Sequence, residues 1–105
     1  MKKESSYRPS PQRHLETQIR RARVIPILTV DDEATALSVA DALVAGGVTA
    51  LEITLRTSAG LPALSRIRKY LPQLTLAAGT VRSIDDYHAA IDAGVDFAVS
   101  PGSTP

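Results

Sequence analysis

The sequence predicts an α/β fold in which four parallel strands alternate with helices. Short apolar, β-branched runs alternate with stretches whose apolar residues recur at helical spacing, and the alternation repeats about every 23 residues. Strands that are joined through helices run parallel, because the right-handed crossover returns the chain to the same end of the sheet. The 105 residues provide room for one domain.

The strands are expected where β-branched and apolar residues run together between turn signals. Their expected ranges are 24–30, 50–55, 75–80 and 97–100.

The intervening helices have recognisable ends and a periodic apolar face. Asp31 and Asp32 are suited to cap the first helix, and the sequence SIDD at residues 83–86 resembles a capping box for the third. Glycines at 46–47 and at Gly94 end these two helices. The apolar faces are expected at Leu37, Ala40 and Val44, at Leu61, Leu64, Ile67 and Leu71, and at Ile84, Tyr87 and Ile91.

The first 23 residues differ from the rest in charge. They hold seven basic and two acidic residues, a net charge of +5, whereas the remainder holds five basic and nine acidic residues, a net charge of −4. We expect residues 1–11, with two prolines, to form a flexible basic tail and residues 12–23 to form a short amphipathic helix. Because Tyr7 is the one Phe, Tyr or Trp among its bases, too few aromatic residues for a stacking platform, nucleic-acid binding is not expected of this arm.

The composition excludes several kinds of site. The absence of cysteine excludes disulfides, thiolate nucleophiles and cysteine-based zinc sites, and since nothing requires an oxidising compartment we expect a cytoplasmic protein. His14 and His88 lie too far apart to suggest a metal site, and no cofactor is expected. No apolar run approaches the roughly 18 residues that a membrane span needs.

Regular connections of this kind suit a (β/α) barrel or a small doubly wound sheet. The first strand is followed by an acidic turn at residues 31–33 instead of a glycine-rich phosphate loop, which argues against a nucleotide-binding sheet. A barrel carries its chemistry at the carboxyl ends of its strands, where we expect Arg56, Thr80 and Ser100, with Glu52 slightly deeper. A closed barrel needs eight strands, so residues 12–105 are expected to form half of a (β/α)8 TIM barrel with two open sheet edges.

From about residue 15 to residue 105 the chain resembles the N-terminal half of a 2-keto-3-deoxy-6-phosphogluconate (KDPG) aldolase, a family that includes 4-hydroxy-2-oxoglutarate (KHG) aldolases. The resemblance rests on VIPILTV, DALVAGGV, LEITLRT, AAGTV and AVSPG, which begin at residues 24, 41, 51, 77 and 98. It implies a class I aldolase, in which a lysine forms a Schiff base with pyruvate and a retro-aldol cleavage releases an aldehyde. It further implies that Glu52 is the general acid/base and that Arg56 and Thr80 bind the carboxylate of pyruvate or a related 2-keto acid.

The residue types agree with these roles. Glu52, Thr54 and Arg56 share one face of an extended strand, and the roughly 13 Å between Glu52 and Arg56 leaves room for a small keto acid. A guanidinium offers two parallel donors to a carboxylate. The structural alternatives are a buried Glu52–Arg56 ion pair that only supports the interior, and a Thr80 hydroxyl that is bonded to nearby backbone.

The family's Schiff-base lysine lies on the sixth strand, in the half that is absent here. The lysines of this chain are Lys2, Lys3 and Lys69, and none is expected on a strand. We therefore expect no aldolase activity from the chain alone. Two roles remain open: the pyruvate-binding half of an aldolase, or a non-catalytic binding or assembly protein that holds a small carboxylate. Partners are expected at the open sheet edges, either a second copy of the chain or a complementing C-terminal half.

Overall fold

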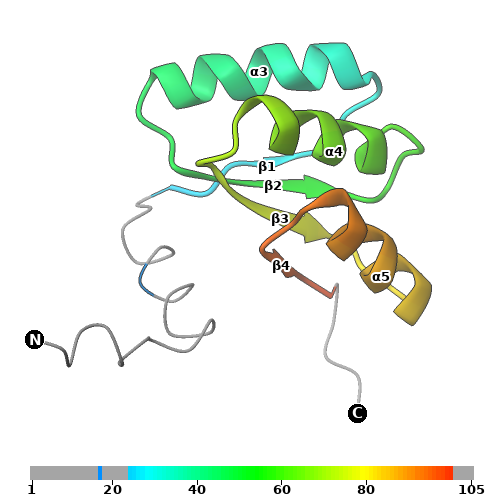
Figure 1. Cartoon of the computed structure of the whole chain (residues 1–105). Helices are drawn as coiled ribbons and strands as arrows, with labels where there is room; N and C mark the ends of the chain where they lie inside the picture. Colours follow the sequence, from blue (N-terminus) through cyan, green and yellow to red (C-terminus); the bar gives the residue numbers. More distant parts are fainter. Residues whose placement is uncertain (1–16, 18–23, 101–105) are drawn as a thin grey trace, which may run out of the picture.

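In the computed structural model, residue 17 and residues 24–100 are described. Within them a four-stranded parallel sheet has the order β1-β2-β3-β4, and three helices lie along one of its faces (Figure 1). This arrangement confirms the predicted α/β fold. The expected tail and, apart from Thr17, the expected helix over 12–23 lie outside the described residues. The elements are β1 (Ile27–Leu28), α3 (Glu33–Ala45), β2 (Ala50–Thr54), α4 (Gly60–Tyr70), β3 (Thr75–Gly79), α5 (Ile84–Ala93) and β4 (Phe97–Ala98).

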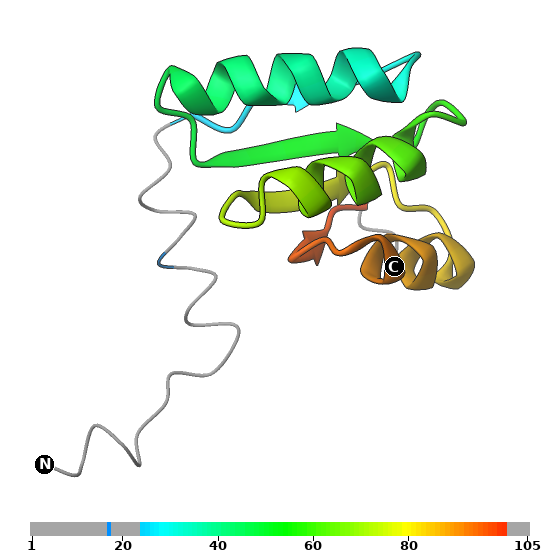
Figure 2. The ribbon, with the colours of Figure 1, turned by 45° about the horizontal axis from the view of Figure 1, so that its top comes forward.

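The core lies between the sheet and the helix layer (Figure 2). Leu51 and Ile53 of β2 point toward the helices and are fully buried, as are Leu64 and Ile67 of α4. Burying a side chain of this size contributes about 1.5–3 kcal/mol. The predicted apolar face of α4 is therefore the one that anchors this helix to the sheet.

The helix ends follow the predicted signals. Asp32 caps α3 by accepting a hydrogen bond from the Thr35 amide at 2.8 Å, and this bond holds the pKa of the Asp32 carboxyl below its ordinary value. Gly94 ends α5 with a left-handed φ of 102°, a conformation that favours glycine.

The predicted capping box at α5 is only half formed. The Ser83 hydroxyl accepts from the Asp86 amide at 3.0 Å, as a capping box requires. The Asp86 carboxylate, however, accepts from the Arg82 amide at 3.1 Å and not from that of Ser83. The aspartate side chain is one methylene shorter than the usual glutamate, and in this helix its carboxylate reaches the amide before the cap residue.

The strands are shorter than the sequence predicts. Of the expected 24–30, only Ile27 and Leu28 form β1, because this edge strand has one described neighbour and Pro26 has no amide to donate. The β2 strand ends at Thr54 and β3 at Gly79, each one residue earlier than expected, and β4 covers only Phe97 and Ala98 of 97–100.

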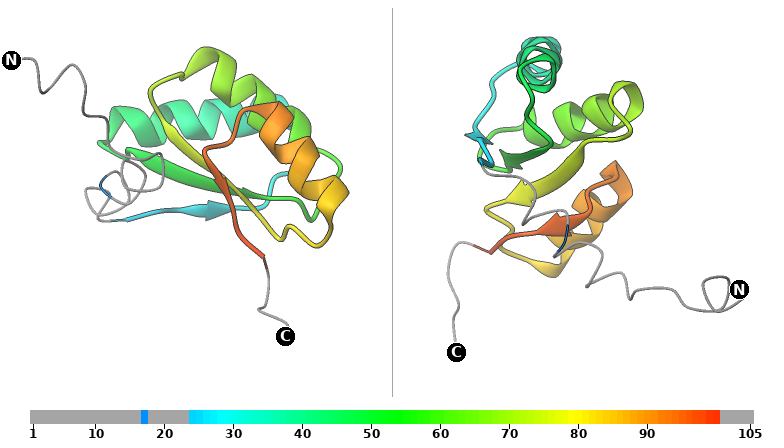
Figure 3. Two further views of the ribbon diagram at one scale, coloured as in Figure 1. Left: turned by 60° about the horizontal axis from the view of Figure 1, so that its bottom comes forward. Right: turned by 90° about the vertical axis from the view of Figure 1, so that its left-hand side faces the viewer.

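The second face of the sheet carries none of the described helices (Figure 3). Residues that are paired in neighbouring parallel strands point to the same side, so the register places Ile27, Glu52 and Ala77 in one row on this face. Ile27 is 64% exposed there. In a closed barrel this face is the interior, and we call it the inner face below.

The apolar stripe of α5 faces outward. Ile84, Tyr87 and Ile91 share a face as predicted, yet all three are exposed, Ile84 by 71%. The helix is anchored instead by Ala90, which is fully buried. The shared face was predicted from the sequence, whereas its exposure in the described part of the protein is a finding of the structure.

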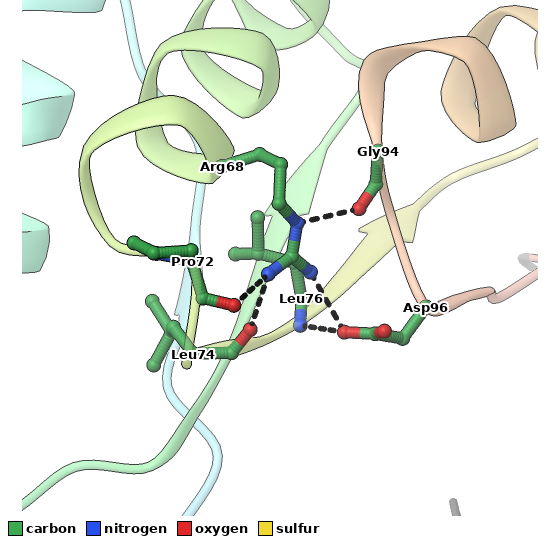
Figure 4. A network of polar contacts seen from close by, with 6 residues as sticks. All are labelled: Arg68, Pro72, Leu74, Leu76, Gly94 and Asp96. Atoms are coloured by element: carbon green, nitrogen blue, oxygen red, sulfur yellow. Dashed lines mark hydrogen bonds and ion pairs between the residues drawn. The ribbon is translucent and has the colours of Figure 1, made fainter.

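At the amino-terminal end of the sheet, Arg68 joins three elements (Figure 4). Its Nε donates to the Gly94 carbonyl at 2.8 Å, and its Nη2 donates to Asp96 at 2.8 Å. Its Nη1 donates to the carbonyls of Pro72 and Leu74, both at 2.9 Å. We call this set of contacts the Arg68 clamp.

Candidate active site

Glu52 lies on the inner face in the middle of β2. Its amide donates to the Pro26 carbonyl at 2.9 Å, which fixes this part of β2 against the chain before β1. The side chain is half-buried and points away from the helix layer. Its carboxylate makes no hydrogen bond or ion pair with another described residue, and it lies directly over the backbone of Gly79 in β3.

Arg56 does not continue the strand. The chain turns at Leu55 and Arg56, and Arg56 is exposed. The turn is fixed by two contacts: the Leu55 amide donates to the Gly79 carbonyl at 2.9 Å, and the Thr57 hydroxyl donates to the Val30 carbonyl. The expectation that Glu52 and Arg56 share one face of an extended strand is thus wrong, because β2 ends before Arg56.

The structural alternative of a Glu52–Arg56 ion pair is also wrong. The ion pairs between described residues are Arg66 with Glu33 and Arg68 with Asp96. The Arg56 guanidinium therefore remains available at the carboxyl end of β2 for a group that the described residues do not supply.

Thr80 follows β3 directly and has a φ of 59°. A left-handed conformation costs a residue other than glycine roughly 1–2 kcal/mol, and a β-branched side chain is among the least tolerant of it. Thr80 is nevertheless buried, and the next amide, of Val81, donates to the Val99 carbonyl at 3.0 Å. The Thr80 hydroxyl makes no hydrogen bond with any described residue, so the alternative of a bond to nearby backbone is not found there.

One pair of polar residues near the site was not predicted. The hydroxyls of Thr29 and Thr54 lie 2.8 Å apart on the inner face, joining β2 to the residue after β1. The alternation along β2 places Thr54 on the side of Glu52, but only the register of the two strands brings Thr29 beside it. Ser100, the other strand-end candidate, is exposed, and the proline and glycine after it lie outside the described residues.

The arrangement combines a guanidinium and a hydroxyl at the carboxyl ends of two adjacent parallel strands with a carboxylate from the middle of one of them. A carboxylate can move a proton, whereas a guanidinium and a hydroxyl can bind an anion. Among the described residues, no three His, Asp or Glu side chains gather as a metal site would require. No helix in the described part of the chain is long and apolar enough to cross a membrane.

Known proteins of one family match most of the chain. A family model described as KDPG and KHG aldolase matches residues 15–105. A 2-dehydro-3-deoxy-phosphogluconate aldolase of Pseudomonas aeruginosa is 50% identical over 90 residues, which make up 86% of this chain and 41% of that protein.

Solved structures of the same family superpose on the chain. The KDPG aldolase of Zymomonas mobilis with 3-phosphoglycerate matches with a TM-score of 0.79 and 43% identity, over 88% of this chain and 44% of the other. The KDPG aldolase of Legionella pneumophila, with pyruvate captured as a covalent carbinolamine intermediate, matches with a TM-score of 0.75 and 40% identity, over 79% and 40%.

The chain thus spans about two fifths of the length of these relatives. Its four strands and their helices correspond to part of a TIM-barrel-type fold. Because the family model covers most of the sequence and the relatives share up to half of the matched residues, the chain belongs to the KDPG and KHG aldolase family.

Proposed function

We propose that this chain is the pyruvate-binding part of a Schiff-base-forming aldolase that cleaves KDPG or KHG to pyruvate and an aldehyde. One observation carries the proposal: Arg56 and Thr80 follow the carboxyl ends of β2 and β3, Glu52 lies deeper in β2, and none of the three side chains is paired with a described residue. Supporting it, a relative of 40% identity has been solved with pyruvate as a covalent carbinolamine.

In this proposal Arg56 and Thr80 bind the carboxylate of the keto acid. The guanidinium supplies charge and two parallel donors, and the Thr80 hydroxyl supplies a third. Such anchoring would hold the keto carbon near Glu52, which lies deeper on the inner face of β2. The strained backbone of Thr80 supports a role in binding, because strain of this kind gathers at functional sites.

Glu52 moves protons. When an amine adds to the keto group, a carboxylic acid can protonate the carbinolamine hydroxyl so that it leaves as water. The resulting carboxylate can then take the proton from the hydroxyl at the carbon beyond the scissile bond. The C–C bond breaks, its electron pair passes to the iminium as an enamine, and the aldehyde is released. No described residue binds the Glu52 carboxylate, so it is available for both steps as far as the described part of the chain is concerned.

The chain by itself is proposed to be unable to supply the amine. Lys69 is an exposed residue near the end of α4, and its Nζ lies 5.5 Å from the centre of the Tyr70 ring. A nucleophilic lysine is activated by desolvation or by a neighbouring cation within a site, and an exposed helix end offers neither. We therefore propose no turnover by this chain alone.

The partner that completes the site is proposed to bind at the open edges of the sheet. Ile27 at the β1 side and Val99 after β4 are exposed apolar residues, and the α5 stripe is exposed beside β4. Self-association of two copies, with β4 of each beside β1 of the other, would bring four strands to each half of an eight-strand ring. A complementing half that carries a lysine would occupy the same edges.

The first experiment is intact-mass analysis after incubation with pyruvate and borohydride, which traps a Schiff base as a stable adduct. We expect an unchanged mass for the chain alone. An adduct on this chain would contradict the proposal that it lacks a usable amine.

Binding of pyruvate is measured separately by NMR titration of the same chain. We expect binding that is weakened in Arg56→Ala and Thr80→Gly and unaffected in the matched surface variant Arg82→Ala, whose side chain is also exposed. Equal binding by all these variants would contradict the assigned roles of Arg56 and Thr80.

The alternative role as a non-catalytic binding or assembly protein is favoured by the exposed apolar residues at both edges. The two roles differ when a lysine-bearing C-terminal half of a family member is added. Cleavage should then appear, and be lost in Glu52→Gln, only if the chain is the pyruvate-binding part of an aldolase.

A further inference from the structure

Gly79 and Glu52 lie unusually close together for residues on adjacent strands. If Gly79 carried a Cβ, that atom would stand 3.2 Å from Glu52 Cγ, 2.8 Å from Cδ and 2.0 Å from Oε2. The distance falls along the side chain, so Glu52 extends toward Gly79 and its carboxylate occupies the space that any other residue at position 79 would fill.

The backbone at this position does not require glycine. The glycines with a positive φ among the described residues are Gly47 and Gly94, and Gly79 is not one of them. Gly79 is the last residue of β3, where an alanine would be tolerated by the backbone alone. The feature that excludes a larger residue is therefore the Glu52 side chain.

The register of β2 and β3 shows in which direction the Glu52 carboxylate points. Glu52 is paired with Ala77, whereas Gly79 is paired with Thr54, one pleat nearer the carboxyl end of the sheet. Ala77 has a Cβ on the inner face and Gly79 has none, so the open space lies toward the strand ends. There the carboxylate approaches the end of β3, which Thr80 follows directly.

The backbone of Gly79 is held on both sides. Its carbonyl accepts from the Leu55 amide at 2.9 Å, and the residue before it accepts from the Val99 amide at 2.8 Å. An added methyl group could not move β3 aside without breaking these bonds, whereas the carboxylate is the far end of a flexible side chain. The carboxylate is consequently the group that would move.

We propose that Gly79 is a positioning residue for Glu52: by lacking a side chain, it lets the Glu52 carboxylate lie across β3 toward the strand ends. The inference deepens the proposed function, on which it rests for the catalytic meaning of Glu52. The contact itself is a property of the fold and can be tested separately.

The test is NMR on chain labelled with ¹³C at glutamate, compared between the wild type, Gly79→Ala and Gly46→Ala. Gly46 is the matched control, because a Cβ there would meet its nearest atoms at 3.5 and 3.6 Å, an ordinary contact. The Glu52 signals are assigned by their loss in Glu52→Gln. We expect a cross-peak between the Glu52 Hγ and Gly79 Hα protons in the wild type and in Gly46→Ala.

In Gly79→Ala we expect the Glu52 Cδ chemical shift to change from its wild-type value several-fold more than in Gly46→Ala. The amide signals of β2 and β3 should remain those of a folded protein. Should Gly79→Ala fail to fold, Glu52→Ala/Gly79→Ala removes the obstructing atoms and is expected to restore the folded spectrum. Any of three results would overturn the inference. The wild type could lack the cross-peak, or the Glu52 Cδ signal could shift no more in Gly79→Ala than in Gly46→Ala. The double variant could also be as unfolded as the single one.

Pyruvate titration of the same samples separates this inference from the proposed function. We expect pyruvate to perturb the Glu52 signal in the wild type and several-fold less in Gly79→Ala. If pyruvate perturbs no signal in the wild type while the cross-peak is present, the proposed function fails and the positioning stands. If pyruvate perturbs Glu52 equally in both proteins, the positioning role fails and pyruvate binding stands.

Discussion

Arg68 of α4 and Asp96, in the connection between α5 and β4, are joined by an ion pair at 2.8 Å. The same Asp96 oxygen accepts from the Leu76 amide of β3, also at 2.8 Å. One carboxylate oxygen thus links a helix, a central strand and the start of the last strand. Because this end of the sheet is opposite the candidate site, the Arg68 clamp can be altered without touching Glu52, Arg56 or Thr80.

We expect Arg68→Lys to lower the free energy of unfolding by about 1.5–3 kcal/mol, since a lysine cannot reproduce a fork that serves three carbonyls and a carboxylate. Urea denaturation measures the change. The matched control is Arg66→Lys, because the Arg66–Glu33 pair is longer, at 3.7 Å, and exposed, and such pairs contribute about 0–1 kcal/mol. An equal loss of unfolding free energy in both variants would show that the Arg68 clamp contributes no more than an exposed ion pair.

The Asp32 cap predicts a pH dependence. The hydrogen bond from the Thr35 amide lowers the pKa of Asp32 below its ordinary value, so the folded state favours the charged carboxylate. This stabilisation is present above the unfolded pKa and is lost as the pH falls through the folded pKa. We expect the difference in stability between wild type and Asp32→Ala to shrink below about pH 4.

The control for this dependence is Asp31→Ala, since Asp31 precedes the cap and does not accept from Thr35. Thermal unfolding is followed from neutral to acidic pH. An Asp32→Ala difference that stays constant across the acidic range would argue that the cap does not act through its charge.

Thr80→Gly is expected to stabilise the fold by about 1 kcal/mol and to weaken pyruvate binding. Glycine removes the cost of a left-handed φ of 59°, and the substitution also removes the hydroxyl that is proposed to bind the carboxylate. The control is Thr75→Gly, within β3, which we expect to destabilise the protein. A loss of stability at position 80 as large as that at position 75 would contradict the strain argument.

Ile84→Lys is expected to weaken self-association without unfolding the chain, because Ile84 is 71% exposed on the α5 stripe. Sedimentation equilibrium measures the association. Gln73→Lys adds the same charge at an exposed loop and serves as the control. A strictly monomeric wild type at high concentration would refute the proposed pairing of two copies.

The sequence by itself determined the elements, their order and the family. Alternating apolar runs and helical periodicity predicted the strands and helices, and the predicted Asp32 and Gly94 are among the caps that the structure contains. These features are local, because a cap or a periodic face depends on residues within one or two turns. Glu52, Arg56 and Thr80 were likewise named from motifs that lie within single segments.

Only the tertiary structure decided which of these residues meet. Three contacts join residues that are about 25 positions apart in the chain: Thr29 with Thr54, Arg68 with Asp96, and Glu52 with Gly79. They depend on strand register and on how the helices pack against the sheet. The apolar periodicity of the sequence also did not predict that the α5 stripe is exposed, or that the chain turns before Arg56. Periodicity shows that side chains share a face, whereas packing against a particular neighbour decides whether that face is buried and where a strand ends.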